Sequence, residues 1–175
     1  MEMTDSRLIA AAPAVVWAAL LDPEVLKASV PGCEELTGTA ETGFEAAVVQ
    51  KVGPVKARFT GAVSVSEITE GRSLTLTGEG KGGVAGFAKG AAQVTLEPEG
   101  DGTRLTYAVE AKVGGKLAQL GNRIIDGFAR KMADDFFTRF QEAVEGPAPD
   151  EADVPAAEGD AAPKKGWFKR VLGSD

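Results

Sequence analysis

Hydrophobic and small residues recur at every second position along much of residues 34–113, which is the period of a β-strand. Residues 55–66 and 105–113 show the alternation in full, and Leu74 and Leu76 repeat it between polar neighbours. Glycine-bearing turns separate the runs. Strands with one apolar and one polar face, joined by short turns, are typical of an antiparallel meander.

Helical spacing replaces this alternation on both sides of the strand region. On the amino-terminal side, Pro13 begins a segment whose apolar residues share one helical face: Val16, Trp17, Leu20 and Leu21. Asp22 and Pro23 are expected to end that helix and begin a second short one, since proline is tolerated at the first helical position. A first strand is expected over residues 6–11.

On the carboxy-terminal side, apolar residues spaced three or four apart predict one long helix over residues 117–144. They are Leu117, Leu120, Ile124, Phe128, Met132, Phe136 and Phe140. Such a helix is about 42 Å long. The side of the helix that carries the apolar residues rotates gradually along its length, which suits packing against a strongly curved sheet. The expected order is one strand, two short helices, about six more strands and one long helix, an α+β fold.

Composition excludes several classes of chemistry. The chain of 175 residues has one cysteine and no histidine. We therefore expect no disulfide framework, no Cys/His metal site and no catalysis that needs an imidazole base. The formal net charge of −7 argues against a general nucleic-acid-binding surface. Cys33 has no histidine to activate it, so we expect a packing residue rather than a nucleophile.

Charge divides the chain into three segments. Residues 1–144 carry 15 basic and 19 acidic side chains and form the predicted folded domain. Residues 145–163 carry six acids, four prolines and no base, which predicts a disordered linker. Residues 164–175 carry four bases, one acid and an aromatic pair.

The last segment suits an anionic membrane surface, because basic and interfacial aromatic side chains lie close together in it. The expected membrane-binding residues are Lys164, Lys165, Trp167, Phe168, Lys169 and Arg170. A docking peptide for a protein partner and a tail without a role are the alternatives. The amino terminus lacks the basic start and the apolar run of a signal peptide, so we expect a cytoplasmic protein.

Several short motifs lie between residues 3 and 144. They are the opening Pro13, Val16-Trp17, Leu20 and Asp22-Pro23, then Pro31-Gly32-Cys33, Val52-Gly53-Pro54-Val55 leading into Phe59-x-Gly61, Gly102-Thr103-x-Leu105, the run from Gly115 to Arg123, and Phe136-Phe137. Together they resemble the carbon monoxide dehydrogenase CoxG family, a branch of the START-like (SRPBCC) helix-grip superfamily. The resemblance implies a curved antiparallel sheet of about seven strands around a long carboxy-terminal helix, with two short helices after the first strand.

The resemblance also implies a function. CoxG-like proteins accompany molybdenum hydroxylases of the carbon monoxide dehydrogenase type. It therefore implies a non-enzymatic accessory protein that binds a respiratory quinone, menaquinone or ubiquinone, and couples the dehydrogenase to the inner face of the cell membrane. No covalent cofactor and no metal are expected. The alternatives are a recruitment or maturation factor that acts through protein contacts alone, and a START-like cyclase or hydrolase, which an inward cluster of ionisable groups would favour.

The resemblance implies a ligand cavity between the sheet and the long helix. The expected lining residues are Phe59, Leu76 and Tyr107 from the strands and Leu120, Ile124, Phe128 and Met132 from the helix. Plain core packing is the alternative for these apolar residues. Residues 78–83 match the pattern G-x-G-x-x-G, but strand-like sequence follows them. A hairpin or a flexible loop at the cavity mouth is therefore expected, rather than a dinucleotide site.

Overall fold

The computed structural model describes residues 1–146. Met1–Phe140 form one compact unit, and Gln141–Glu145, the end of the last helix, belong to a second. The elements are β1 (Glu2–Ile9), α1 (Pro13–Leu20), α2 (Pro23–Ser29), β2 (Cys33–Thr39), β3 (Gly43–Val52), β4 (Val55–Thr69), β5 (Ser73–Lys81), the 3-10 helix η1 (Gly83–Ala85), β6 (Phe87–Glu99), β7 (Gly102–Gly114), the 3-10 helix η2 (Gly115–Leu120) and α3 (Asn122–Glu145). Residues 147–163 of the predicted linker lie outside the described residues, and so does the predicted tail, residues 164–175.

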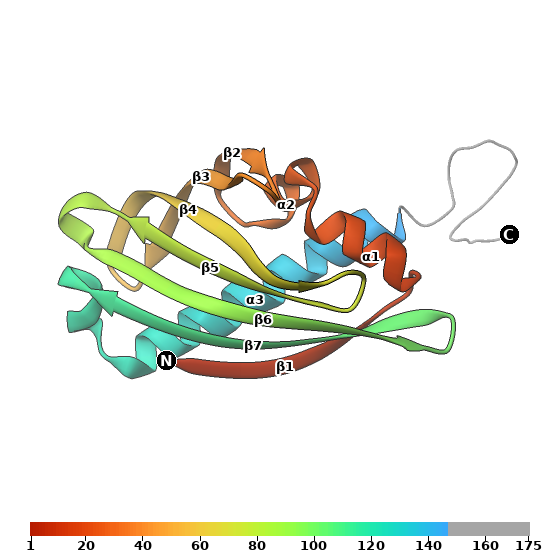
Figure 1. The fold of residues 1–175 in the computed structure, drawn as a ribbon. Coiled ribbons are helices and arrows are strands. Elements are labelled where there is room, and N and C mark those ends of the chain that lie inside the picture. Colours follow the sequence, from red (N-terminus) through yellow and green to blue (C-terminus); the bar gives the residue numbers. More distant parts are fainter. Residues whose placement is uncertain (147–175) are drawn as a thin grey trace, which may run out of the picture. The chain divides into compact units, whose positions relative to one another are not determined.

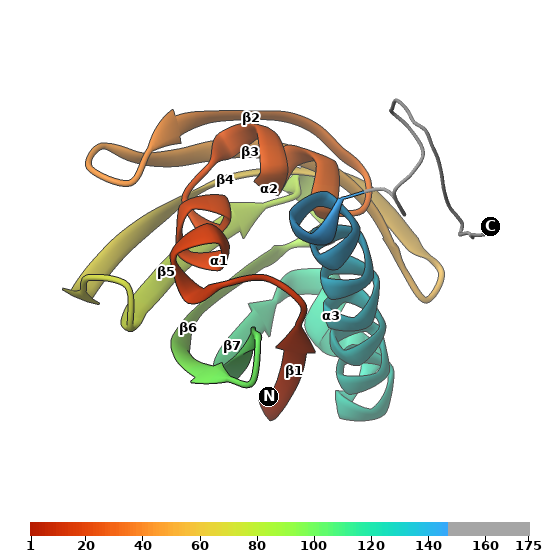
Figure 2. The same cartoon turned by 90° about the vertical axis from the view of Figure 1, so that its right-hand side faces the viewer.

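All seven strands form one sheet in the order β1-β7-β6-β5-β4-β3-β2, and every neighbouring pair is antiparallel. The strands run side by side in Figure 1, and in Figure 2 they form an arc with α3 on its open side. The predicted meander is confirmed from β2 to β7. A curved sheet of seven strands with one long helix confirms the predicted α+β fold.

Alternate residues of each strand face the helix side of the sheet. In β7, Thr103, Leu105 and Tyr107 are buried, and the residues between them are not. Cross-strand pairs carry this alternation through the sheet, because Tyr107 pairs with Val94 and Val94 pairs with Leu74. We call this side the inner face and the opposite side the outer face.

Proline and aspartate fix the two short helices where the sequence predicts them. Pro13 and Pro23 lie in the first turns of α1 and α2. The Asp22 side chain accepts a hydrogen bond from the backbone N–H of Glu24 at 2.9 Å, which caps α2. Of the four apolar residues expected on one face, α1 buries Val16, Trp17 and Leu20, and Leu21 is half-buried at the C-cap.

The long helix begins later than predicted. Leu117 and Leu120 belong to η2, because Gly121 has a φ of 89° and interrupts the helical backbone there. This left-handed value is favourable for glycine. α3 begins at Asn122 and, with 24 residues, is about 36 Å long. The spacing of apolar residues continues across the break, which is why it predicts one helix.

The first strand begins earlier than predicted, at Glu2 rather than at residue 6. The inward residues of β1 are Met3, Asp5, Arg7 and Ile9, opposite inward residues of β7. Two of the four are charged, so the strand lacks the apolar alternation that marks the others. The amino-terminal ammonium group also donates a hydrogen bond to the Ala111 carbonyl at 3.0 Å, which holds the start of β1 on the sheet.

The hydrophobic core is concentrated where α1 packs on β6 and β7. Four large side chains are fully buried in this core: Phe140, Ile9, Leu96 and Leu105. The ring of Phe137 stacks on Tyr107 with the centroids 4.9 Å apart, and Phe136 stacks on Phe140 at 5.7 Å. Aromatic side chains of α3 therefore fill this part of the inner face.

Candidate functional site

The inner face is lined by small residues beyond the aromatic cluster. One row across the sheet consists of Ala46, Gly61, Gly80 and Ala88, which are successive cross-strand partners from β3 to β6. The next row contains Gly78, Gly90 and Ala111 from β5 to β7. Because these residues have almost no side chain, they cannot fill the space between the sheet and α3.

The result is an apolar hollow of about 430 Å³ on the inner face. Small inward residues of five strands line it: Ala46, Gly61, Gly78, Gly80, Ala88, Gly90, Ala92 and Ala111. Larger apolar residues also line it: Val48, Phe59, Val63, Leu76 and Val109. The remaining lining residues are outward positions of the same strands: Thr60, Ala62, Glu79, Lys89, Ala91 and Glu110. Inward residues of β4 from Val55 to Val65 are all half-buried, so this part of the face is not covered as the core is. The volume lies within the range of about 300–1,000 Å³ typical of ligand sites.

Two of the predicted lining residues from the sheet lie in this hollow, and the third does not. Phe59 and Leu76 are among its lining residues. Tyr107 instead stacks on Phe137 and is only 4% exposed, within the core. The sequence pattern alone cannot separate these positions, since all three are inward residues of similar strands.

The predicted helix residues are divided between two locations. A Cβ atom built on Gly53, in the β3–β4 turn, would lie 3.5 Å from the Ile124 side chain and 3.9 Å from that of Leu120. These two residues therefore connect the β3–β4 hairpin to the start of α3. Phe128 and Met132 are half-buried on α3. None of these four is among the residues that line the hollow.

A cluster of ionisable groups lies between β1 and α3. The Arg7 guanidinium donates a hydrogen bond to the Asp134 carboxylate and lies over the Phe137 ring, 5.4 Å from its centroid. Burial, followed by the charge of Asp5, raises the pKa of the Tyr107 phenol. The cluster thus consists of an ion pair and a phenol that keeps its proton at neutral pH.

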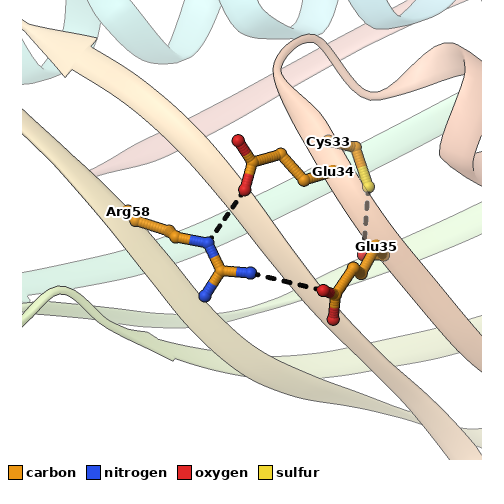
Figure 3. A network of polar contacts seen from close by, with 4 residues as sticks. All are labelled: Cys33, Glu34, Glu35 and Arg58. Atoms are coloured by element: carbon orange, nitrogen blue, oxygen red, sulfur yellow. Dashed lines mark hydrogen bonds and ion pairs between the residues drawn. The ribbon is translucent and has the colours of Figure 1, made fainter.

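Figure 3 shows a second polar cluster, at the start of β2. The Arg58 guanidinium on β4 donates a hydrogen bond to Glu34 at 2.8 Å and lies 3.5 Å from a Glu35 oxygen. The Cys33 thiol donates a hydrogen bond to the Glu35 carbonyl at 3.3 Å. Burial raises the pKa of this thiol, which disfavours the thiolate that a nucleophile needs. The expected packing role of Cys33 fits this environment.

A larger depression, of about 710 Å³, lies at the outer face. Its charged lining residues are Glu2, Glu45, Glu79, Lys89, Glu110 and Lys112. Charged side chains of both signs are costly to desolvate, which disfavours an apolar ligand in the depression. Glu79, Lys89 and Glu110 line the hollow as well, but the larger apolar residues Val48, Phe59, Leu76 and Val109 line only the hollow. We therefore place the candidate site in the smaller hollow of the inner face.

The glycine-rich segment 78–83 joins two antiparallel strands. β5 ends at Lys81, the short η1 follows, and β6 begins at Phe87. A dinucleotide site of this pattern needs a helix after the strand, so the expected loop is confirmed. Within residues 1–146 the structure contains no cluster of three or more potential metal ligands and no helix long and apolar enough to span a membrane.

A curved seven-stranded sheet with an apolar hollow facing a long helix defines a START-like helix-grip protein. Solved structures share this fold. A START superfamily protein from Mycobacterium smegmatis matches with a TM-score of 0.61 and 14% identity, over 82% of this chain and 97% of its own. A conserved protein from Geobacillus kaustophilus matches with a TM-score of 0.77 and 29% identity, over 83% of this chain and 95% of its own.

The family model for the carbon monoxide dehydrogenase subunit CoxG matches residues 6–145, and the chain belongs to this family. The predicted resemblance is confirmed. CoxG is an accessory subunit family rather than a catalytic one, associated with carbon monoxide dehydrogenase. No curated protein matches the chain.

Proposed function

We propose that this protein is a non-enzymatic accessory protein of a molybdenum-containing carbon monoxide dehydrogenase, or a related one, that holds a respiratory quinone in the hollow of the inner face. The observation that carries the proposal is the hollow itself, an apolar space of about 430 Å³ lined by Phe59 and Leu76 and by glycine and alanine residues. The quinone would be menaquinone or ubiquinone, and it would supply the two-electron chemistry.

The lining residues suit a planar apolar ring. Glycine rows at Gly78, Gly80 and Gly90 allow a flat group to approach the backbone of the sheet closely. Phe59 and Leu76 supply apolar contact area on the same face. Burial of some 300 Å² of ligand surface would contribute roughly 7 kcal/mol before ordering costs, so weak to moderate affinity is expected.

The ionisable cluster at β1 lies outside the hollow and therefore does not support the enzyme alternative. Arg7 is paired with Asp134, and burial keeps the Tyr107 phenol protonated by raising its pKa. None of these three residues lines the hollow. They are therefore positioned to join β1 to α3, and not to act on a bound ligand.

Membrane attachment completes the proposal. The basic and aromatic residues of 164–175 would hold the protein at an anionic leaflet, by salt-sensitive and reversible contacts. The protein would then act at the cytoplasmic side of the cell membrane, between the dehydrogenase and the quinone pool. Truncation after Val144 is expected to weaken vesicle binding without unfolding the domain.

The test is ligand retention by variants that fill the hollow. Gly80→Leu adds a side chain inside it, and a Cβ atom at Gly80 would meet neighbouring atoms only at 3.9 Å. Ser64→Leu is the matched control on β4, because Ser64 is exposed and lines the outer depression, not the hollow. Organic extraction of each purified protein, followed by mass spectrometry, measures the retained quinone.

We expect quinone from the wild type and from Ser64→Leu, and at least a tenfold loss from Gly80→Leu, since an occupied hollow excludes the ring. Equal retention by both variants would show that the ligand lies elsewhere. If no protein retains quinone and short-chain quinones do not bind at micromolar concentration, the quinone-binding proposal is wrong. The alternative function is then recruitment of the dehydrogenase through protein contacts alone.

A further inference from the structure

Three chain segments meet at the end of the hollow opposite the aromatic cluster. They are residues 50–57 at the β3–β4 turn, residues 80–89 around η1, and residues 111–125 from the end of β7 to the start of α3. Gly53 lies beside Ile124, and η1 contacts both η2 and β4. Figure 1 shows these connections at the same end of the sheet. We call this the open end.

The open end is basic, although the domain as a whole is acidic. Its three segments contain seven bases and no acid: Lys51, Lys56, Lys81, Lys89, Lys112, Lys116 and Arg123. All seven side chains are exposed. The rest of residues 1–144 holds eight bases against 19 acids. Basic charge is therefore concentrated at one end of the domain.

None of these bases forms an ion pair within residues 1–146, although Glu79 is the direct cross-strand partner of Lys89 between β5 and β6. The ion pairs of the described residues involve Arg7, Arg58, Arg104 and Lys131 instead. Lys51 and Lys56 are direct cross-strand partners in the β3–β4 hairpin, and Lys89 and Lys112 are partners between β6 and β7. Like charges placed opposite each other destabilise a sheet unless an external anion compensates them.

Exposed apolar side chains accompany these charges. Val84 in η1 is 86% exposed, Phe87 at the start of β6 is 38% exposed, and Ile124 at the start of α3 is 41% exposed. They are half of the six large apolar residues that residues 1–146 expose. Exposed apolar residues surrounded by bases combine the two features that bind an anionic bilayer.

The open end also borders the ligand hollow. The Phe59 ring, which lines the hollow, lies against Gly82 beside η1. An apolar molecule that leaves the hollow at this end would therefore pass the exposed Val84 side chain of η1. A ligand with a long apolar chain gains from such a path, because its transfer avoids water.

We propose that the open end is a second, folded membrane-binding surface, which contacts an anionic bilayer through η1 and the surrounding lysines independently of residues 164–175. Its use in ligand transfer rests on the proposed function, whereas its affinity for lipid does not. A purely acidic protein surface would pair with the lysines but would leave Val84 and Phe87 in water, so the bilayer is the occupant that uses both features.

The first test measures whether the open end itself contacts the lipid. Total vesicle binding cannot show this, because residues 164–175 also contribute to binding in the full chain. A polarity-sensitive dye is attached to Cys33→Ser/Val84→Cys, and in the control protein to Cys33→Ser/Ile68→Cys. Ile68 is 47% exposed at the β4–β5 end of the sheet, outside the open end. With vesicles of phosphatidylcholine and phosphatidylglycerol, dye emission should shift to the blue at position 84 and stay unchanged at position 68.

The second test reverses charge at the open end. Lys51→Glu/Lys56→Glu and the control Arg72→Glu/Arg139→Glu change the net charge equally and alter only exposed side chains. Sedimentation with the same vesicles should show affinity lower by at least about tenfold for the lysine variant than for the control, since each lysine near an anionic surface contributes roughly a fivefold factor.

Equal dye shifts at positions 84 and 68, or equal affinities of the two charge variants, would overturn the proposal. Loss of dehydrogenase binding by the lysine variant, with vesicle binding unchanged, would overturn it in favour of a protein-docking surface. Both tests use vesicles without quinone, and quinone binding is measured in solution without vesicles. Failure of the membrane surface is therefore distinguishable from failure of the quinone proposal.

Discussion

Gly61 on β4 and Gly80 on β5 are direct cross-strand partners on the inner face, yet only Gly80 has room for a side chain. A Cβ atom built on Gly61 would overlap the backbone carbonyl of Glu79, whereas one on Gly80 would meet its neighbours at 3.9 Å. The two glycines therefore have different functions. Gly61 permits the close approach of two strands, and Gly80 leaves the hollow open.

Alanine at each of these glycines should separate the two functions. Gly61→Ala should lower the free energy of unfolding by about 1–3 kcal/mol, because backbone must move to admit the methyl group. Gly80→Ala should leave it unchanged or raise it by up to about 1 kcal/mol, through the reduced entropy of the unfolded chain. Urea denaturation measures both values. Equal destabilisation would mean that the β4–β5 ladder is not as close at Gly61 as described.

Truncation of phenylalanine should distinguish the packed core from the hollow. Phe140 is fully buried, so Phe140→Ala should cost about 3–5 kcal/mol of stability. Phe59 is half-buried and lines the hollow, so Phe59→Ala should cost less than about 2 kcal/mol while weakening ligand binding. Thermal denaturation and quinone titration of both variants check this. A larger stability loss for Phe59→Ala would place it in the core instead.

Stability at alkaline pH should depend on Tyr107. Its ordinary pKa is 10.0, and burial together with the charge of Asp5 raises the pKa in the folded protein. Above about pH 10 the unfolded chain therefore binds fewer protons at this group, so stability falls as pH rises through the folded pKa. Tyr107→Phe keeps the ring for stacking on Phe137 and should reduce this slope. Identical pH dependence of the free energy of unfolding in both proteins would contradict the assignment.

Cys33 should react slowly with alkylating reagents. Its ordinary pKa is 9.0, and burial raises it in the folded protein, partly offset by the Glu35 carbonyl contact and the charge of Lys27. At pH 8 the thiolate fraction is therefore smaller than in the unfolded chain, and alkylation should be several-fold slower than in denaturant. Lys27→Ala removes the stabilising charge and should slow it further. A faster reaction in the folded protein would indicate an activated thiol.

The fold is largely predictable from the sequence, because its signals are local. Alternation marks the strands from residue 34 to 113, and Asp22 with Pro23 marks the start of α2. Two boundaries were predicted wrongly for physical reasons. β1 has charged inward residues, and Gly121 interrupts a helical spacing that continues through it.

The site is less predictable, because it depends on which inward residues meet another side chain. Phe59 and Leu76 line the hollow, while Tyr107, similar in pattern, is covered by Phe137. The small residues at Gly78 and Gly90 carry the clearer signal, since glycine at inward strand positions leaves space. The partnership of Arg7 with Asp134 joins residues 127 apart in sequence, which no local pattern reveals.

Site-resolved NMR of the 15N-labelled protein, titrated with a short-chain quinone, tests the central claim most directly. If the hollow of the inner face holds the ligand, the largest amide shifts should occur at Leu76, Ala88 and Ala92, which line only the hollow, with little change at Leu105 in the core. Gly80→Leu should abolish these shifts, and Ser64→Leu should preserve them. Shifts centred on the outer-face residues Ser64 and Thr77, or no shifts at saturating quinone, would contradict the claim.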